Sequence, residues 1–198
     1  MKRQVPLGAP SAGNARRAVK TTRLTLTAFT MALRAKGSRP SRFMTAIIYF
    51  GEIFVASLLA VALLSISPLG VLSASELFVG GVVVWTLIEY LVHRFVLHDL
   101  FPTRHGMHHA NPDEPVLTVF WQIWACFAVV YFVADGAFLA GALVAYAWYL
   151  FVHHSAHHSP NNLLLSLLKH HRTHHRFATR NFGVSTSLWD HVFRTMSR

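Results

Sequence analysis

The chain has 198 residues, of which 53% are hydrophobic and 13% are charged, and its formal net charge is +10. Soluble domains carry about 25% charged residues, so this composition indicates that lipid is the solvent around much of the chain. The single cysteine, Cys126, excludes an internal disulfide and any metal site that needs two thiolates. Fourteen histidines are the strongest compositional signal.

The N-terminal segment, residues 1–42, is the most basic part of the chain. We interpret it as a disordered cytoplasmic tail that follows the positive-inside rule, with residues 43–198 forming the remaining domain. An Arg-rich transit peptide and a nucleic-acid-binding arm are the alternatives, and we expect no nucleic-acid partner. The segment has no acidic residue and ten basic ones: Lys2, Arg3, Arg16, Arg17, Lys20, Arg23, Arg34, Lys36, Arg39 and Arg42.

Four apolar runs follow, and each approaches the ~20 residues that a helix needs to cross a bilayer. They cover residues 43–64, 75–97, 116–134 and 137–152, and the first is interrupted only by Glu52. Pro68 with Gly70, and Asp135 with Gly136, supply turns within two hairpins. We therefore predict an all-α integral membrane bundle of about four transmembrane helices.

The distribution of basic residues predicts the orientation of these spans. With the N-terminal tail inside, the second and fourth spans return to the cytoplasmic side near His98 and His153. The basic segment from Lys169 to the C-terminus then lies on the same side. We expect both termini and every histidine to be cytoplasmic.

Ten of the histidines follow a pattern of repeated spacings. Each residue of an α-helix advances ~100° around the axis, so residues three or four apart lie close to one face. The spacings are His-x4-His, His-x2-His-His, His-x3-His and again His-x2-His-His, formed by His93, His98, His105, His108, His109, His153, His157, His171, His174 and His175. This register predicts a histidine-rich cap that holds two metal ions.

The angular spacing also suggests which histidines share an ion. Residues at i and i+4, such as His153 and His157, are ~40° apart and can bind one ion. The i,i+3 pairs that begin the two His-x2-His-His motifs are ~60° apart and can do the same. Adjacent histidines, and His93 with His98 at ~140°, favour separate ions.

Four histidines and one carboxylate lie outside this pattern. His154, His158, His170 and His191 fit no shared face, so we expect them at the membrane interface or supporting a ligand. Glu89 is a carboxylate inside an apolar helix, where it could accept a ring N–H from a liganding histidine or pair with Arg94. A pH-sensing cluster, a membrane metal transporter and a structural zinc protein are the non-enzymatic alternatives.

The motifs resemble those of the fatty acid hydroxylase/sterol desaturase superfamily of membrane di-iron oxygenases, and within it those of the fatty acid 2-hydroxylases. The similar segments are residues 89–98, with Glu89, His93 and His98; the HGxHH motif at 105–109 with Pro112 and Asp113; Tyr149 with His153, His157 and His158; and an ending that contains Leu168, Lys169, His171, His174, His175, Phe182, Gly183, Trp189, Asp190, Phe193 and Thr195. Together they cover about residues 80–198.

The resemblance implies an O2-dependent enzyme that hydroxylates a lipid acyl chain with two iron ions, which zinc can replace in purified protein. A sterol desaturase or carotenoid hydroxylase-type lipid oxidase is the alternative within the superfamily. The resemblance further implies two ion sites. One ion would be held by His93, His105, His108, His171 and His174, and the second by His98, His109, His153, His157 and His175. The chain has no G-x-G-x-x-G fingerprint, so we expect a separate electron donor, a cytochrome b5-like protein or a ferredoxin.

Overall fold

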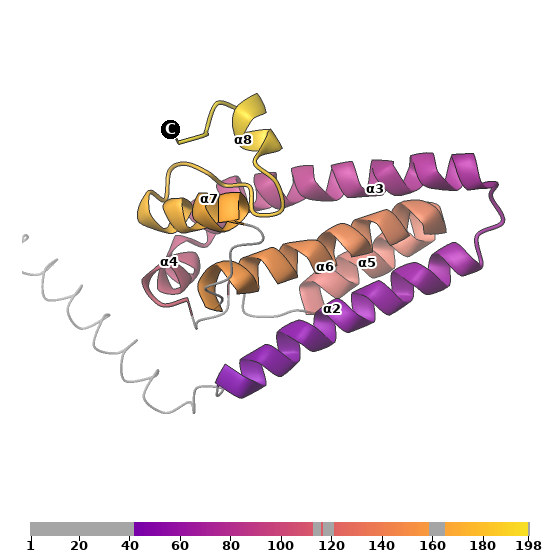
Figure 1. Ribbon diagram of the computed structural model, residues 1–198, viewed down its shortest axis with the longest axis horizontal. Coiled ribbons are helices and arrows are strands. Elements are labelled where there is room, and N and C mark those ends of the chain that lie inside the picture. Colours follow the sequence, from indigo (N-terminus) through magenta and orange to yellow (C-terminus); the bar gives the residue numbers. More distant parts are fainter. Residues whose placement is uncertain (1–41, 113–115, 117–120, 159–164, 198) are drawn as a thin grey trace, which may run out of the picture. The chain divides into compact units, whose positions relative to one another are not determined.

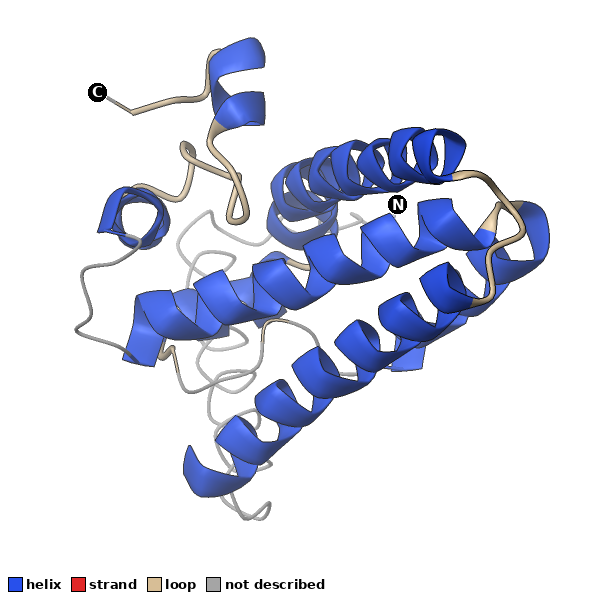
Figure 2. Cartoon of the chain, turned by 45° about the vertical axis from the view of Figure 1, so that its right-hand side comes forward, coloured by secondary structure: helices blue, strands red, loops and turns tan. Residues whose placement is uncertain are grey.

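The computed structural model describes residues 42–112, 116, 121–158 and 165–197, and Figure 2 shows that helices and loops make up this described part. Of the basic segment 1–42, only Arg42 lies among the described residues. The elements are α2 (Arg42–Ser65), α3 (Val71–Leu91), the π-helix η1 (Val92–Leu100), α4 (Pro102–Ala110), α5 (Trp121–Val133), α6 (Gly136–His158), α7 (Leu165–Arg176) and α8 (Leu188–Val192).

Three segments are long and apolar enough to cross a membrane: Ile47–Ser65, Val71–Leu100 and Gly136–His158. They agree with the first, second and fourth predicted spans. The third predicted span contains α5, whose 13 residues reach ~20 Å, whereas the hydrocarbon core of a bilayer is ~30 Å thick. The all-helical membrane bundle is confirmed, and the number of four spans stays a prediction.

Helix α6 forms the centre of the bundle, with α2 and α3 packed against it (Figure 1). Small residues line much of its buried surface, among them Ala140, Gly141 and Ala147. A Cβ built on Gly81 of α3 would lie 2.0 Å from the Phe138 carbonyl oxygen, and one built on Gly141 would lie 2.0 Å from the Phe78 carbonyl oxygen. The two backbones therefore touch, as small residues allow in membrane helices.

The histidine-bearing elements gather at one end of this bundle. Figure 1 shows α4 and α7 beside the ends of α3 and α6. The second span, α3 continued by η1, has 30 residues and extends over ~45 Å, which exceeds the bilayer core by ~15 Å. This surplus is about the length of η1. The histidines of η1 can therefore lie at or above the membrane surface.

Candidate metal centre

The ten patterned histidines form two groups of five. Within each group the nearest ring nitrogens all lie within 4.8 Å of one another. Group A contains His93, His98, His105, His109 and His174, and group B contains His108, His153, His157, His171 and His175. The groups adjoin, because the rings of His109 and His175 stack with centroids 4.3 Å apart. Neither group includes His154, His158, His170 or His191.

This grouping differs from the expected division at four positions. His98 and His109 lie in group A, and His108 and His171 lie in group B, the reverse of what the resemblance implied. The expectation that His93 and His98 bind separate ions is also wrong. They lie on η1, and π-helical hydrogen bonds join residues five apart, which brings both rings to one face.

The α-helical pairs explain the rest of the grouping. The partners within one group are i,i+4 pairs: His105 with His109, and His171 with His175. Their ~40° separation is smaller than the ~60° of the i,i+3 pairs that we expected to share an ion. Adjacent histidines do fall into different groups, and His153 and His157 do share one, as predicted.

The nitrogen positions in group A fit a bound metal ion. The Nε2 atom of His105 lies 3.0 Å from that of His93 and 3.1 Å from that of His109. Nitrogens bound at right angles to one ion, each at ~2.1 Å, are ~3.0 Å apart, whereas tetrahedral ligands are ~3.4 Å apart. The short spacing and the five donors fit one ion with a coordination number above four.

Hydrogen bonds to backbone carbonyls set the proton positions of two group A rings. His93 Nδ1 donates to the Phe182 carbonyl oxygen at 2.5 Å, and His174 Nδ1 donates to that of Arg180 at 2.7 Å. A carbonyl only accepts, so each Nδ1 carries the proton. The Nε2 lone pairs of both rings therefore point to the centre of the group, which is the form that binds a metal.

Group B repeats this convergence. His153 Nε2 lies 3.1 Å from His108 Nε2, and His157 Nε2 lies 3.1 Å from His171 Nε2. Four of its five members, from α6 and α7, come in i,i+4 pairs, and the fifth comes from α4. Group B therefore also offers several inward-facing imidazole nitrogens to one ion.

The electrostatics of the cap favour neutral imidazoles. Burial, together with the charges of neighbouring histidines, lowers the pKa of His105 to about 2, that of His109 to about 4 and that of His175 to about 3. Burial also holds the pKa of His171 well below its usual value. Neutral imidazole is the state that binds a metal, so these rings need not lose a proton near pH 7.

Glu89 has different partners from those expected. Its carboxylate accepts hydrogen bonds from the backbone N–H groups of Val184 and Ser185, and from the Ser185 hydroxyl. The expected bond to a histidine ring is wrong, because backbone carbonyls take that role for His93 and His174. Arg94 donates to the Tyr90 hydroxyl at 2.9 Å, so the alternative pairing with Glu89 is not formed either.

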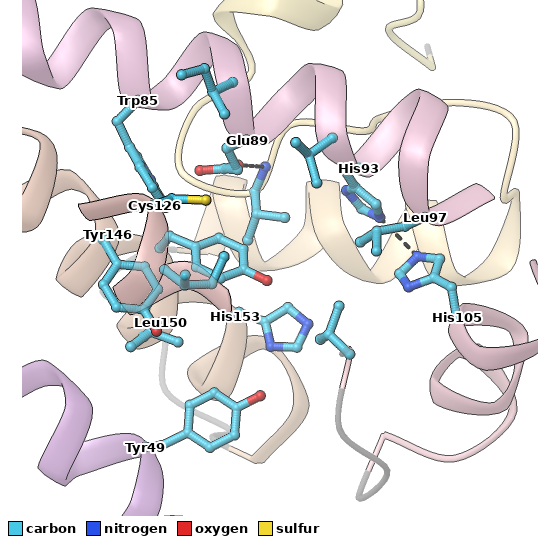
Figure 3. A pocket seen from close by; sticks show the side chains of 16 residues that line it. Tyr49, Trp85, Glu89, His93, Leu97, His105, Cys126, Tyr146, Leu150 and His153 are labelled. Atoms are coloured by element: carbon cyan, nitrogen blue, oxygen red, sulfur yellow. Dashed lines mark hydrogen bonds between the residues drawn. The ribbon is translucent and has the colours of Figure 1, made fainter. Parts of the chain in front are cut away.

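An apolar cavity of about 200 Å3 lies beside both groups. Residues of α2, α3, η1, α4, α5 and α6 line it. Figure 3 shows His93, His105 and His153 at one side with Trp85, Cys126 and Tyr146 at the other. Ile88 on α3 and Cys126 on α5 are both lining and exposed. The cavity lining therefore includes two side chains that are also accessible from outside the bundle.

The residues that hold the cap together were missed as functional residues. Asp190 is fully buried and accepts hydrogen bonds from the backbone of Phe182 and Gly183. The available signal was its charge, because it is the single acidic residue after Asp135 in a basic segment. The carbonyls of Arg180 and Phe182 had no signal, since any residue type supplies a carbonyl.

Comparisons with known proteins agree with this geometry. Residues 78–195 match the fatty acid hydroxylase family. The chain is similar to the fatty acid 2-hydroxylase of Rattus norvegicus, with 34% identity over 145 residues, or 61% of this chain and 39% of the relative. It is similar to the dihydroceramide fatty acyl 2-hydroxylase FAH2 of Arabidopsis thaliana, with 31% identity over 140 residues, or 59% of this chain and 58% of the relative.

A solved structure is also similar, that of full-length scs7p with only the hydroxylase domain visible. The TM-score is 0.60 and the identity 28%, and the match covers 79% of this chain and 66% of the other. The matched region is 39% of the first relative and 58% of the second, so this chain spans less than two thirds of the length of either.

Proposed function

The chain belongs to the fatty acid hydroxylase family, and from this premise we propose that it is a membrane-bound, O2-dependent hydroxylase of a lipid acyl chain. The observation that supports this most is the pair of five-histidine groups beside an apolar cavity in a membrane bundle. A metal transporter would need ligands along a path across the membrane, whereas both groups lie at one end of the bundle.

We propose two resident iron ions, one held by each histidine group. Bound iron supplies the redox chemistry needed to activate O2, which zinc in the same ligands does not. The protein's part is to hold ten neutral imidazoles in place. The carbonyls of Phe182 and Arg180 fix the rings of His93 and His174, and burial keeps the rings unprotonated.

The cavity is proposed to bind the acyl chain. Its lining is mostly apolar, and the polar groups near the histidine end are Glu89, three histidines and the tyrosines Tyr49 and Tyr149, whose rings stack on His153. Both groups lie at the end of the spans. A lipid headgroup at the membrane surface would therefore bring the first carbons of the acyl chain nearest to the histidines, including the carbon bonded to the carboxyl carbon. We therefore propose hydroxylation at that carbon. Ile88 and Cys126 line the cavity and are exposed, so we propose that the acyl chain enters from the bilayer between them.

Orientation and electron supply complete the proposal. The basic residues predict that the cap and both termini face the cytoplasm. Exposed cations on and after α7, namely Lys169, Arg172, Arg176 and Arg180, would attract an acidic electron donor such as a cytochrome b5-like protein or a ferredoxin.

Lipid analysis of a host that expresses the chain tests this function. The expected result is a new 2-hydroxy acyl product with the intact chain and none with His174→Ala, which removes one group A nitrogen. Equal membrane levels of both proteins, measured by immunoblot, are the required control. A lipid profile that is unchanged over a broad range of acyl substrates would contradict the proposal.

A further inference from the structure

Residues 180–185, here called the carbonyl loop, connect α7 to the segment before α8 and contact the metal centre through their backbone. Their two carbonyls from Arg180 and Phe182 accept the Nδ1–H groups of His174 and His93. Both histidines belong to group A. The loop therefore orients two of the five nitrogens of one group, although none of its side chains is a metal ligand candidate.

Two buried carboxylates hold this loop through four consecutive backbone N–H groups. Phe182 and Gly183 donate to Asp190 at 2.9 and 2.8 Å. Val184 and Ser185 donate to Glu89 at 2.7 and 3.0 Å. Hydrogen bonds to an ionised acceptor such as Asp190 are roughly twice as strong as neutral ones, so Asp190 holds its part of the loop firmly.

Asp190 is the centre of this arrangement. It has no exposed surface and also accepts hydrogen bonds from His170 Nε2 at 2.9 Å and from the Thr195 hydroxyl at 2.6 Å. Burial raises the pKa of Asp190, but these bonds and those from the loop lower it more, so the carboxylate stays ionised. Gly183 also packs closely against Asp190. A Cβ built on Gly183 would lie 3.0 Å from Asp190 Oδ2 and 2.2 Å from the Thr186 carbonyl oxygen.

Group B has no comparable support from this loop. His171 Nδ1 and His175 Nε2 have no hydrogen-bond partner among the described residues, and a backbone hydrogen bond joins the His175 ring to His109 rather than to the loop. In group A, the outward nitrogens of His105 and His109 are likewise without a partner among the described residues, so the anchored rings are His93 and His174. The two groups therefore differ in how their rings are held.

We infer that Asp190 is a positioning residue for the group A metal site: by fixing the carbonyl loop, its carboxylate sets the ring orientation and tautomer of His93 and His174. The Arg180 and Phe182 carbonyls accept hydrogen bonds from group A rings, so the effect of Asp190 on ring orientation is expected at group A. This inference rests on the proposed function only in that both groups bind metal. Loss of a partner that orients a ligand typically costs 10–100-fold in metal affinity.

Cobalt(II) titration of the purified, metal-free full chain tests the inference without turnover, since the visible absorption of Co2+ reports each coordination site. Wild type is expected to fill two sites. Asp190→Asn should weaken group A by ~10–100-fold and leave group B unchanged. Glu76→Gln, which removes an exposed carboxylate at the start of α3, is the charge control and should change neither site.

Background variants assign the effect to a site. In a protein that lacks His153 and His157 through alanine substitution, Asp190→Asn should still weaken the remaining site. In a protein that lacks His105 and His109, it should have no further effect. Gly183→Ala disturbs the same loop without removing a charge. The same selective loss of metal affinity at group A is expected from it. This second variant tests the inference even where Asp190→Asn does not fold.

Equal weakening of both sites by these variants would show a general structural role and overturn the inference, as would unchanged affinity at group A. Selective loss at group A in a protein that oxidises no lipid would support the inference while the proposed function fails. Unchanged cobalt binding in a protein that hydroxylates lipid normally would overturn the inference alone.

Discussion

Replacing Gly81 by alanine should force α3 and α6 apart. The new Cβ would lie 2.0 Å from the Phe138 carbonyl oxygen and 2.9 Å from the Ala142 nitrogen, whereas ordinary contacts begin at 3.4 Å. Both are backbone atoms, so a change of rotamer cannot relieve the overlap. Overpacking of this kind costs ~1–3 kcal/mol, and the better helix propensity of alanine returns at most ~1 kcal/mol.

Gly80 offers the matched control one residue away on the same helix. Its Cβ would meet the Phe138 ring at 3.8 Å, an ordinary contact, so Gly80→Ala should be neutral or slightly stabilising. Thermal unfolding of both variants in detergent, followed by circular dichroism, measures the difference. If Gly81→Ala proved as stable as Gly80→Ala, the close packing of α3 on α6 would be wrong.

Three further predictions concern the cap and the cavity. The double variant His105→Ala/His109→Ala should lower the metal content from two ions per chain to one, whereas His105→Ala/His108→Ala should weaken both sites; elemental analysis giving the same result for both would contradict the grouping. The metal-free protein should lose stability as the pH falls below ~6.5, because unfolding lets His105, His109 and His175, with folded pKa values of about 2, 4 and 3, take up protons. Unfolding temperatures that stay constant from pH 7.5 to 4.5 would refute this. A bulky lipid-soluble maleimide on Cys126 should block acyl-chain turnover in the wild type but not in Cys126→Ser, and full activity of the labelled wild type would place the entrance elsewhere.

Local sequence patterns predicted the apolar helices and part of the histidine geometry. The 22-residue run beginning at Phe43 became α2, and the i,i+4 pair His153 and His157 falls into one group. These successes rest on properties that operate within a few residues, namely hydropathy and helical periodicity. The same periodicity failed for His93 and His98 because the α-helical angle does not hold in η1.

Long-range contacts could not be predicted in this way. The hydrogen bond from His93 to the Phe182 carbonyl joins residues 89 positions apart, and the bonds from Val184 and Ser185 to Glu89 span similar distances. Nothing in the spacing around Glu89 distinguishes a backbone N–H from a histidine ring as its partner. The contacts of the carbonyl loop form only when α3, α7 and the C-terminal segment pack together, so no local sequence pattern predicts them.

Incorporation of labelled oxygen tests the central claim most directly. Purified, iron-loaded protein with an acyl lipid, a reducing partner and 18O2 should yield a hydroxylated chain whose new hydroxyl carries 18O by mass spectrometry. Unlabelled O2 with H218O should leave the hydroxyl unlabelled. A new double bond without incorporated oxygen would contradict hydroxylation and indicate a desaturase, and a hydroxyl labelled from water would contradict O2 as its source.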